Sequence, residues 1–355
     1  MPLDHFITLG RSGLRVSPLC LGTMTFGEDF GWGASEEESH AMLSEYRNRG
    51  GNFIDTANIY TAGHSEEIVG NHLRQNCLRR DGIVLSTKFY CNLFPGDPNG
   101  GGAGRKALIQ QCEASLKRLQ TDYIDIYWLH NWDQTAPIEE TLRGLDDLVA
   151  AGKIRYVGFS DIPAWKTAQA QTIAHFRGWT PIIALQLEYS LLERTSEGEL
   201  FPMAQGMGMG VMPWSPLKSG FLSGKFRRGG QGNVDTKRTG MVGIPSEADY
   251  DIIEAVADVA SELGVSSASV ALSWVRSRAG VSSTLIGARR VDQLKANLDS
   301  LDVELSAEYC AKLDAVSKPR LNFPADNNAT YAPVLGFPGT TIDGRTVRSP
   351  SSLHE

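Results

Sequence analysis

The sequence lacks the features that would place it in a membrane, in the secretory pathway or around a structural metal. None of its 355 residues belongs to a run of about 18 uninterrupted apolar residues, the length of a membrane span. The first eleven residues carry charges of both signs and no apolar segment of a leader peptide. The cysteines form no C-x-x-C pair and no metal-ligand spacing, which predicts reduced thiols, no metal and a cytoplasmic location; they are Cys20, Cys77, Cys91, Cys112 and Cys310.

The chain also lacks an excess of basic charge. Its 34 Lys and Arg against 41 Asp and Glu give a formal net charge of −7. A broad nucleic-acid interface needs clustered cations, so we expect neither nucleic acid nor a membrane as a partner. A local basic pocket for a phosphate remains compatible with this balance. We expect a small molecule as the partner, and the sequence leaves the oligomeric state open, a homo-oligomer included.

Two glycine-rich segments fall short of nucleotide-binding motifs. Residues 96–104 (GDPNGGGAG) lack the fixed G-x4-G-K-S/T spacing of a phosphate loop. Residues 206–210 (GMGMG) lack the third glycine and the following helix of a dinucleotide fingerprint. We interpret the first as a loop and the second as a turn, so the chain carries no Rossmann signature.

What the sequence does contain is a regular alternation of short apolar runs and longer segments of helical period, which is typical of parallel α/β folds. The apolar runs end near Gly22, Asp55, Lys88, His130, Ser160, Gln186, Trp214 and Gly287. The helical segments cover residues 36–49, 65–74, 105–119, 138–150, 164–174, 196–205, 267–278 and 291–298. Eight strands and eight helices predict one (β/α)8 TIM barrel over residues 1–317.

Segments outside the repeat complete the predicted organisation. Residues 7–10 and 14–16 flank Arg11-Ser12-Gly13, a plausible β-hairpin that would plug the bottom of the barrel. A further helix is expected over residues 307–316. Residues 318–355 are rich in Pro, Gly, Asn, Ser and Thr, and we expect them to form an irregular C-terminal tail.

Four polar side chains fall at consecutive strand ends of this barrel. Asp55, Lys88 and His130 close the second, third and fourth strands, and Tyr60 lies in the loop after the second. Active sites of such barrels lie at the C-terminal ends of the strands, which makes these residues candidates for catalysis. A buried Asp–Lys pair alone would often be a structural ion pair, but four such residues together favour chemistry.

The same residues carry a family resemblance. The segments DTANIY (55–60), GHSEEIVG (63–70), Thr87-Lys88 and LHNWD (129–133) resemble the motifs of the aldo-keto reductases. The resemblance extends over roughly residues 6–316. It implies an oxidoreductase that reduces a carbonyl to an alcohol with NADPH.

The resemblance also implies the roles of the four residues. Hydride arriving at a carbonyl carbon leaves negative charge on the oxygen, so the site must supply a proton and a positive field. Tyr60 would donate the proton, and Lys88 would lower the pKa of its phenol. Asp55 would hold the ammonium, and neutral His130 would orient the carbonyl oxygen or share the proton relay.

The cofactor contacts implied by the resemblance follow the remaining strand ends. Ser160, Asp161 and Gln186 would bind the carboxamide, Trp214 would stack on the nicotinamide, and Arg289 would grip a ribose 2′-phosphate, which favours NADPH. The full set is Gly22, Thr23, Met24, Asp55, Ser160, Asp161, Gln186, Trp214, Ser215, Pro216, Leu217, Gly220, Lys225, Gly287, Arg289, Gln293 and Asn297. Asp161 departs from the Asn usual in the family; it is either a cofactor contact or a helix N-cap before Pro163.

Aromatic side chains in the loops would contact the substrate. Trp32, Phe89 and Trp132 join Tyr60 and His130 as expected substrate contacts, although aromatics near a barrel mouth also pack loops. They favour an apolar or ring-bearing carbonyl, with aldehydes, ketones and keto-sugars all open. Two rivals are a double-bond reductase, which would need a carboxylic acid in place of His130, and a non-enzymatic nucleotide-sensing subunit of the same fold.

Overall fold

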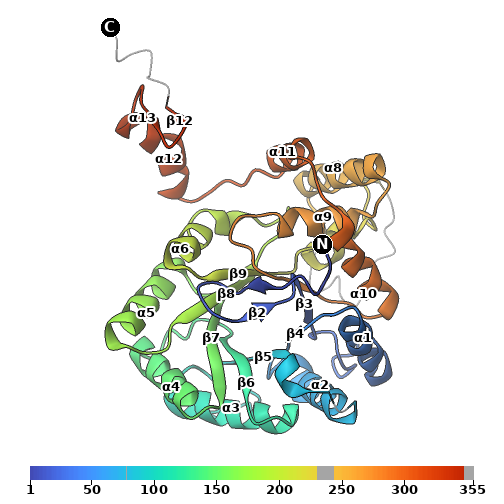
Figure 1. The fold of residues 1–355 in the computed structure, drawn as a ribbon, viewed down its shortest axis with the longest axis vertical. Helices are drawn as coiled ribbons and strands as arrows, with labels where there is room; N and C mark the ends of the chain where they lie inside the picture. Colours follow the sequence, from blue (N-terminus) through green and yellow to red (C-terminus); the bar gives the residue numbers. More distant parts are fainter. Residues whose placement is uncertain (77, 230–243, 348–355) are drawn as a thin grey trace.

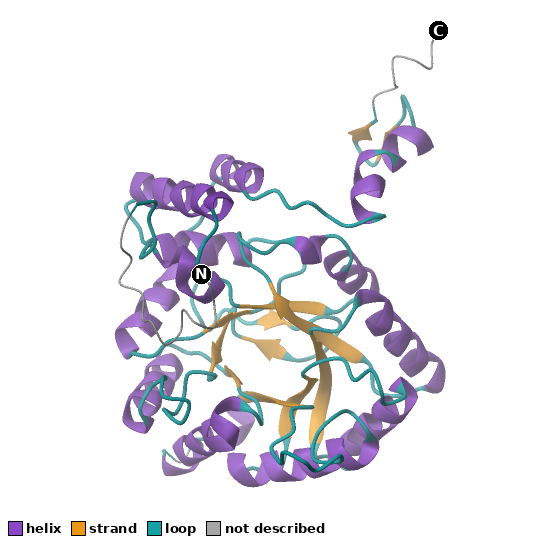
Figure 2. Cartoon of the chain, turned by 180° about the vertical axis from the view of Figure 1, so that it is seen from behind, coloured by secondary structure: helices purple, strands orange, loops and turns teal. Residues whose placement is uncertain are grey.

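Eight parallel strands form a ring that is surrounded by helices (Figures 1 and 2). The computed structural model describes residues 1–76, 78–229 and 244–347, so that Cys77 and the last eight residues of the tail lie outside the described residues. The order of neighbouring strands is β10, β3, β4, β5, β6, β7, β8 and β9. Their bounds are Leu19–Gly22 (β3), Phe53–Asp55 (β4), Val84–Phe89 (β5), Ile124–Leu129 (β6), Ile154–Ser160 (β7), Ile182–Glu188 (β8), Gly210–Trp214 (β9) and Thr284–Ile286 (β10).

Backbone hydrogen bonds close the ring between its first and last strands. Val211 of β9 donates its N–H to the carbonyl of Gly280, and Ser282 donates to the carbonyl of Val211, just before β10 begins. The protein is therefore a (β/α)8 barrel, as the alternation of the sequence predicted.

The helices of the outer layer follow the strands in turn. They are α1 (Glu36–Asn48), α2 (His64–Gln75), α3 (Arg105–Leu119), α4 (Ile138–Ala150), α5 (Ala164–Arg177), α6 (Leu200–Met207), α8 (Glu247–Leu263), α9 (Ser267–Arg276), α10 (Val291–Leu298) and α11 (Ala307–Val316). Within the described ranges no single helix has the length and apolar character of a membrane span, and one bent pair, α8 with α9, reaches them only in combination.

Two apolar cores fill the molecule. The larger one lies between the strands and the helices. The smaller one fills the barrel interior with side chains such as Phe53, Val84 and Trp128. Alternation along a strand sends every second residue inward. Asp55 and Lys88 therefore face the interior, two and four residues after Phe53 and Val84.

An N-terminal hairpin closes the bottom of the barrel. Strands β1 (Ile7–Thr8) and β2 (Arg15–Val16) pair in antiparallel register. Leu9 and Val16 are fully buried and pack into the smaller core. The N–H of Arg11 donates to the carbonyl of Gly208, just before β9 begins, which fixes the hairpin at the N-terminal ends of the strands.

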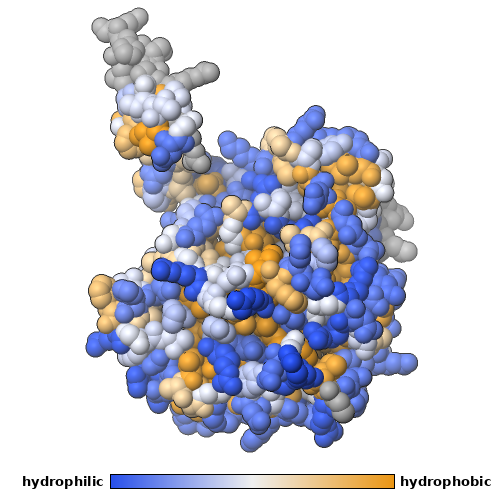
Figure 3. Space-filling view, in the orientation of Figure 1, coloured by the Kyte–Doolittle hydropathy of each residue, from blue (hydrophilic) through white to orange (hydrophobic). Residues whose placement is uncertain are grey.

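The C-terminal tail is more regular than expected. It contains two short helices, α12 (Ala325–Thr330) and α13 (Ala332–Gly336), and a hairpin of β11 (Thr341–Ile342) and β12 (Arg345–Thr346). Figures 1 and 2 show this segment standing away from the barrel. Five of its large apolar side chains are exposed: Phe323, Tyr331, Leu335, Phe337 and Ile342. Figure 3 shows apolar surface on this segment.

Candidate active site

Asp55, Tyr60, Lys88 and His130 meet at the C-terminal end of the barrel. Asp55 is the last residue of β4, Lys88 lies in β5, and His130 directly follows β6. Tyr60 begins the short 3-10 helix η1 (Tyr60–Gly63) after β4. The side chains of Asp55 and Lys88 are fully buried, whereas Tyr60 and His130 are half-buried. The pair thus forms the floor of a site that the other two line.

The Lys88 ammonium uses all three of its donors within this site. It forms an ion pair with Asp55 Oδ2, and it donates to the carbonyl oxygen of Thr56 at 2.9 Å and to the Tyr60 hydroxyl oxygen at 2.9 Å. An ammonium has only three N–H groups, so its position is fixed. Because Tyr60 accepts from Lys88, its own O–H remains available to donate into the cavity.

The Asp55 carboxylate is held from its other side as well. Ser86 donates its hydroxyl to Asp55 Oδ1 at 2.6 Å, and the Gln186 amide donates to the same oxygen at 3.2 Å. A buried ion pair is tolerable only where further hydrogen bonds satisfy its remaining atoms. These two donors from β5 and β8 supply them.

The pKa values of Lys88 and Tyr60 reflect several opposing influences. Burial alone would lower the pKa of Lys88, but Asp55 and Tyr60 outweigh it and raise that pKa. Burial also raises the pKa of Tyr60; Lys88 lowers it and Asp55 raises it, with a net upward shift. Lys88 thus acts in the expected direction, but burial and the neighbouring carboxylate exceed the effect of one ammonium. Tyr60 is protonated at neutral pH.

His130 is neutral in this site. Burial lowers its pKa to about 3, and the positive charge of Lys88 acts in the same direction. Its ring stands edge-on to that of Tyr60, with 6.0 Å between the ring centroids. The Cys91 sulfur lies 3.9 Å from its Nδ1. A neutral imidazole beside the phenol can donate one hydrogen bond without competing for the proton.

Side chains of η1 and α2 fix the loop that carries Tyr60. Thr61 has a φ of 45°, a left-handed conformation, and its hydroxyl donates to the Phe26 carbonyl at 3.0 Å. Ser65 donates its hydroxyl to the Thr23 carbonyl, and the fully buried Glu66 accepts from Thr87 at 2.6 Å. The G-x-S-E motif therefore positions the tyrosine.

A cavity of about 710 Å³ opens beside these residues. Asp55, Tyr60 and His130 line it, and so does each expected cofactor contact except Thr23. Those lining residues are Gly22, Met24, Ser160, Asp161, Gln186, Trp214, Ser215, Pro216, Leu217, Gly220, Lys225, Gly287, Arg289, Gln293 and Asn297. Thr23 is fully buried instead, and its hydroxyl donates to the carbonyl of Asp55.

The expected aromatic substrate contacts differ in how deeply they are buried. Phe89 is fully buried and stacks on Tyr127 with 4.6 Å between centroids, so it does not face a substrate. The reason is strand alternation: Lys88 points into the barrel, and its neighbour must point out to the helices. Trp132 is half-buried and meets the exposed Trp165 edge-on at 5.6 Å. Trp32 is also half-buried.

Comparison with known proteins agrees with this arrangement. The model of the Aldo/keto reductase family matches residues 18–318. The chain belongs to the aldo-keto reductase family. It is 37% identical to a norsolorinic acid reductase of Aspergillus flavus over 331 residues (90% of this chain, 82% of the relative).

Two further relatives carry different names. An aryl-alcohol dehydrogenase of Pestalotiopsis microspora is 35% identical over 361 residues (99% and 88%). A probable voltage-gated potassium channel subunit beta of Oryza sativa subsp. japonica is 37% identical over 332 residues (89% and 98%). Membership of the family supports oxidoreductase activity, and aldo-keto reductases generally use NAD(P)H.

The cavity of this aldo-keto reductase fits such a dinucleotide. The half-buried indole of Trp214 offers a flat surface near Tyr60, and Lys225 and Arg289 supply positive charge for phosphates. The backbone N–H of Arg289 donates to the Gln293 side chain at 3.0 Å, and Asn297 donates to the Gly287 carbonyl at 3.2 Å. These bonds fix the segment that leads into α10.

Asp161, the departure from the family pattern, is not a helix cap. Pro163 occupies the N-cap position of α5. Asp161 Oδ1 accepts a hydrogen bond from the Trp214 indole N–H at 3.1 Å, and Oδ2 accepts from the Ser160 hydroxyl at 3.4 Å. Of the two alternatives left open by the sequence, the structure therefore excludes the cap.

Several lining residues were missed in the sequence. They come from the loop after β9, from the start of α9 and from the segment around β10: Ser219, Phe221, Ser223, Phe226, Ser266, Ala268, Leu272, Leu285, Ile286 and Ala288. Thr25 and Ala296 line the cavity as well. Ser266 caps α9 and accepts from the Ser269 N–H; a serine directly before the helix predicted from residue 267 was a signal that pointed to this segment.

Proposed function

We propose that this aldo-keto reductase reduces an aldehyde or ketone to the alcohol with NADPH. The observation that carries the proposal is the orientation of Tyr60. Its oxygen accepts from the fixed Lys88 ammonium, and its O–H is left to donate into the cavity. When bound, the reduced nicotinamide supplies the hydride.

The residues of this chain would handle the proton and the charge. As negative charge develops on the carbonyl oxygen, the Tyr60 O–H donates its proton, and a C–H and an O–H bond replace the C=O π bond. Lys88 then faces a phenolate 2.9 Å away, and Asp55 keeps the ammonium in place. Neutral His130 donates a hydrogen bond that orients the carbonyl oxygen. General acids of this kind contribute about 10²–10⁴-fold to a rate.

The preference for NADPH rests on Arg289. A guanidinium binds a 2′-phosphate through charge-assisted hydrogen bonds, which a ribose hydroxyl does not match. We expect Arg289→Ala to weaken NADPH binding by about 1.5–3 kcal/mol and to leave NADH binding almost unchanged. Titration by quenching of tryptophan fluorescence measures both. An equal loss for the two cofactors would make Arg289 a structural residue.

The substrate we propose is a ring-bearing carbonyl compound. The edge-to-face pair of Trp132 and Trp165 follows the strand ends that carry His130 and Asp161, and it offers aromatic surface near the barrel mouth. The test is consumption of NADPH with a panel of aryl aldehydes, aryl ketones, aliphatic aldehydes and keto-sugars. Turnover confined to the aliphatic compounds would contradict an aromatic preference, and a panel without any turnover would contradict the reductase.

A second candidate is a nucleotide-sensing regulatory subunit. The relative of Oryza sativa, a probable channel subunit, favours it. Against it stands the complete set: Asp55, Lys88 and Tyr60 are joined by hydrogen bonds, and His130 lies edge-on to the Tyr60 ring. Tight NADPH binding with no turnover of any carbonyl in the panel is the result expected of such a subunit. A double-bond reductase is disfavoured, because His130 stands where that chemistry needs a carboxylic acid.

A further inference from the structure

Asp161 places a carboxylate at the edge of the Trp214 indole. It follows Ser160, the last residue of β7, and its φ of 53° is left-handed. The indole N–H of Trp214 donates to Oδ1 at 3.1 Å and the Ser160 hydroxyl to Oδ2 at 3.4 Å. Both donors are neutral, so neither cancels the charge of the carboxylate.

This edge belongs to the part of the cavity that holds the reacting ring. Hydride transfer requires the nicotinamide next to the carbon whose oxygen meets Tyr60 and His130. Asp161 and Trp214 line the same cavity as those two residues. A ring that stacks on the indole therefore has the Asp161 carboxylate at its own edge. This step rests on the proposed function.

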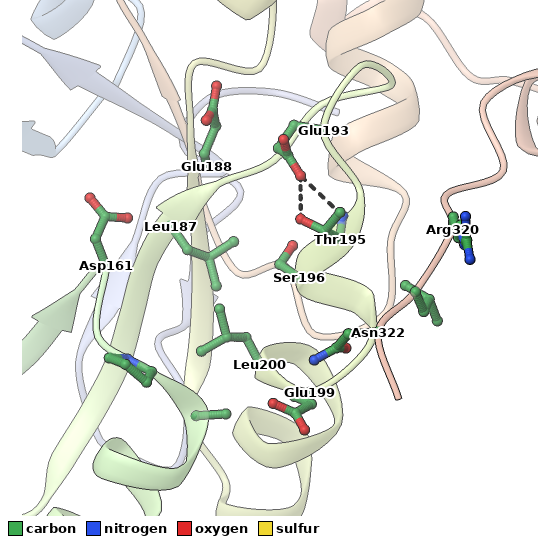
Figure 4. Close-up of a pocket in the computed structure, with 13 residues that line it drawn as sticks. Asp161, Leu187, Glu188, Glu193, Thr195, Ser196, Glu199, Leu200, Arg320 and Asn322 are labelled. Atoms are coloured by element: carbon green, nitrogen blue, oxygen red, sulfur yellow. Dashed lines mark hydrogen bonds between the residues drawn. The ribbon is translucent and has the colours of Figure 1, made fainter. Parts of the chain in front are cut away.

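The neighbouring carboxylates Glu188 and Asp55 are each paired with a lysine, so Asp161 supplies the negative charge at this edge of the indole. Glu188 at the end of β8 pairs with Lys218 at 2.7 Å, and Lys88 pairs with Asp55. Figure 4 shows Asp161 and Glu188 as separate side chains around a neighbouring pocket that Asp161 also lines. His130 carries no charge at neutral pH, because burial lowers its pKa to about 3.

We propose that the ionised Asp161 carboxylate stabilises the oxidised nicotinamide, whose ring carries a positive charge, over the neutral reduced ring. Opposite charges attract in a partly buried cleft, and a neutral ring gains little from the same carboxylate. The enzyme thereby holds its bound cofactor nearer to the oxidised state.

The bias depends on pH with a defined sign. Desolvation by the surrounding protein atoms is the largest influence on the pKa of Asp161, and the net result is a pKa raised to about 6. The hydrogen bonds from Trp214 and Ser160 lower this pKa. The charge of Glu188 raises it, and that of Lys88 lowers it. Above about pH 6 the carboxylate is charged and favours the oxidised ring. Below that pH the group is neutral, and the preference is lost.

The test compares the affinities for NADPH and NADP+ in the wild type and in Asp161→Asn, an isosteric neutral variant. Isothermal titration calorimetry gives both Kd values without turnover. At pH 8 we expect Asp161→Asn to raise the ratio of the Kd for NADP+ to the Kd for NADPH by about five- to tenfold. This is the size of a partly screened charge interaction. The ratio in the wild type should shift the same way between pH 8 and pH 5, and that in the variant should stay flat.

Glu188→Gln is the matched control, because it neutralises a nearby carboxylate that already has a cation. We expect it to change the ratio by less than about twofold. Binding of both cofactors with an unchanged ratio in Asp161→Asn would overturn the inference alone, and so would an equal shift in Glu188→Gln. Failure of either cofactor to bind the wild type would overturn the proposed function together with it.

Discussion

At the scale of single residues, the site depends most on Lys88. Its ammonium is fully buried and touches Asp55, the Thr56 carbonyl and Tyr60. The same cation balances the buried carboxylate and sets the direction of the Tyr60 hydrogen bond. Removing it therefore affects both acidity and alignment.

Lys88→Met should lower turnover at least about a hundredfold. Without the cation, the pKa of Tyr60 rises further above its ordinary value, since burial and Asp55 already raise it. Each lost unit of acidity corresponds to about 1.4 kcal/mol, and misalignment of the phenol adds to it. Folding should suffer less, because Asp55 can take up a proton. Turnover against pH is measured beside a thermal melt; a folded variant with wild-type activity would show that Lys88 does not tune the acid.

The residues that could be predicted were those set by strand ends and motifs. Asp55, Tyr60, Lys88 and His130 meet as expected, since the C-terminal ends of parallel strands share one edge. Phe89 was misassigned, although its alternation with the inward-facing Lys88 would have placed it on the outer face of the strand. The protonation of Tyr60 depends on how completely the site is buried, and the contact of Asp161 with Trp214 joins residues 53 positions apart. Spacing alone cannot give either one.

At the scale of elements, glycine decides how the N-terminal hairpin fits the barrel. Gly10 has a φ of 55°, and a Cβ there would lie 2.2 Å from the Ile183 carbonyl oxygen and 2.6 Å from the Gly210 nitrogen. Both atoms are backbone at the bottom of the barrel strands and cannot move aside. Gly13 in the same hairpin has nothing within 4 Å of such a Cβ.

Gly10→Ala should destabilise the protein by about 2–4 kcal/mol, the combined effect of a left-handed conformation and a backbone clash. Gly13→Ala, the matched control, should change stability by less than about 0.5 kcal/mol. Chemical denaturation measures both. Equal stabilities of the two variants would show that the hairpin does not dock as described.

The helices show which local signals are reliable. The ranges predicted for α3, α4 and α10 agree with the structure, although none of the three has a side-chain hydrogen bond at its N-cap. Helix α6 begins at Leu200 rather than at Ser196, because Pro202 is tolerated only in the first turn of a helix. Helix α8 was missed, although the capping box of Ser246 and Asp249 marks its start.

At the scale of the whole molecule, the barrel and the C-terminal tail contribute unequally to the buried core. The match to the family ends at residue 318. The described side chains of residues 318–347 are exposed or half-buried, so the tail contributes little to a core. Arg320, Leu321 and Asn322 line the pocket shown in Figure 4 together with residues of the barrel.

A chain shortened to residues 1–318 should therefore fold like the full one. We expect its Tm within about 2 °C of the full chain, since little apolar surface is lost from the core. NADPH affinity should stay within about twofold, because no described tail residue lines the larger cavity. A loss of more than about 5 °C would show that the tail is part of the folded unit.

The account as a whole stands on Tyr60 as the proton donor of a carbonyl reduction. The most direct measurement follows NADPH consumption by Tyr60→Phe with the best carbonyl of the panel, beside NADPH affinity from fluorescence titration. The phenol oxygen acts only as charge develops on the substrate, so turnover should be lost while affinity stays within a few fold of the wild type. A variant that retains near wild-type turnover would contradict the account.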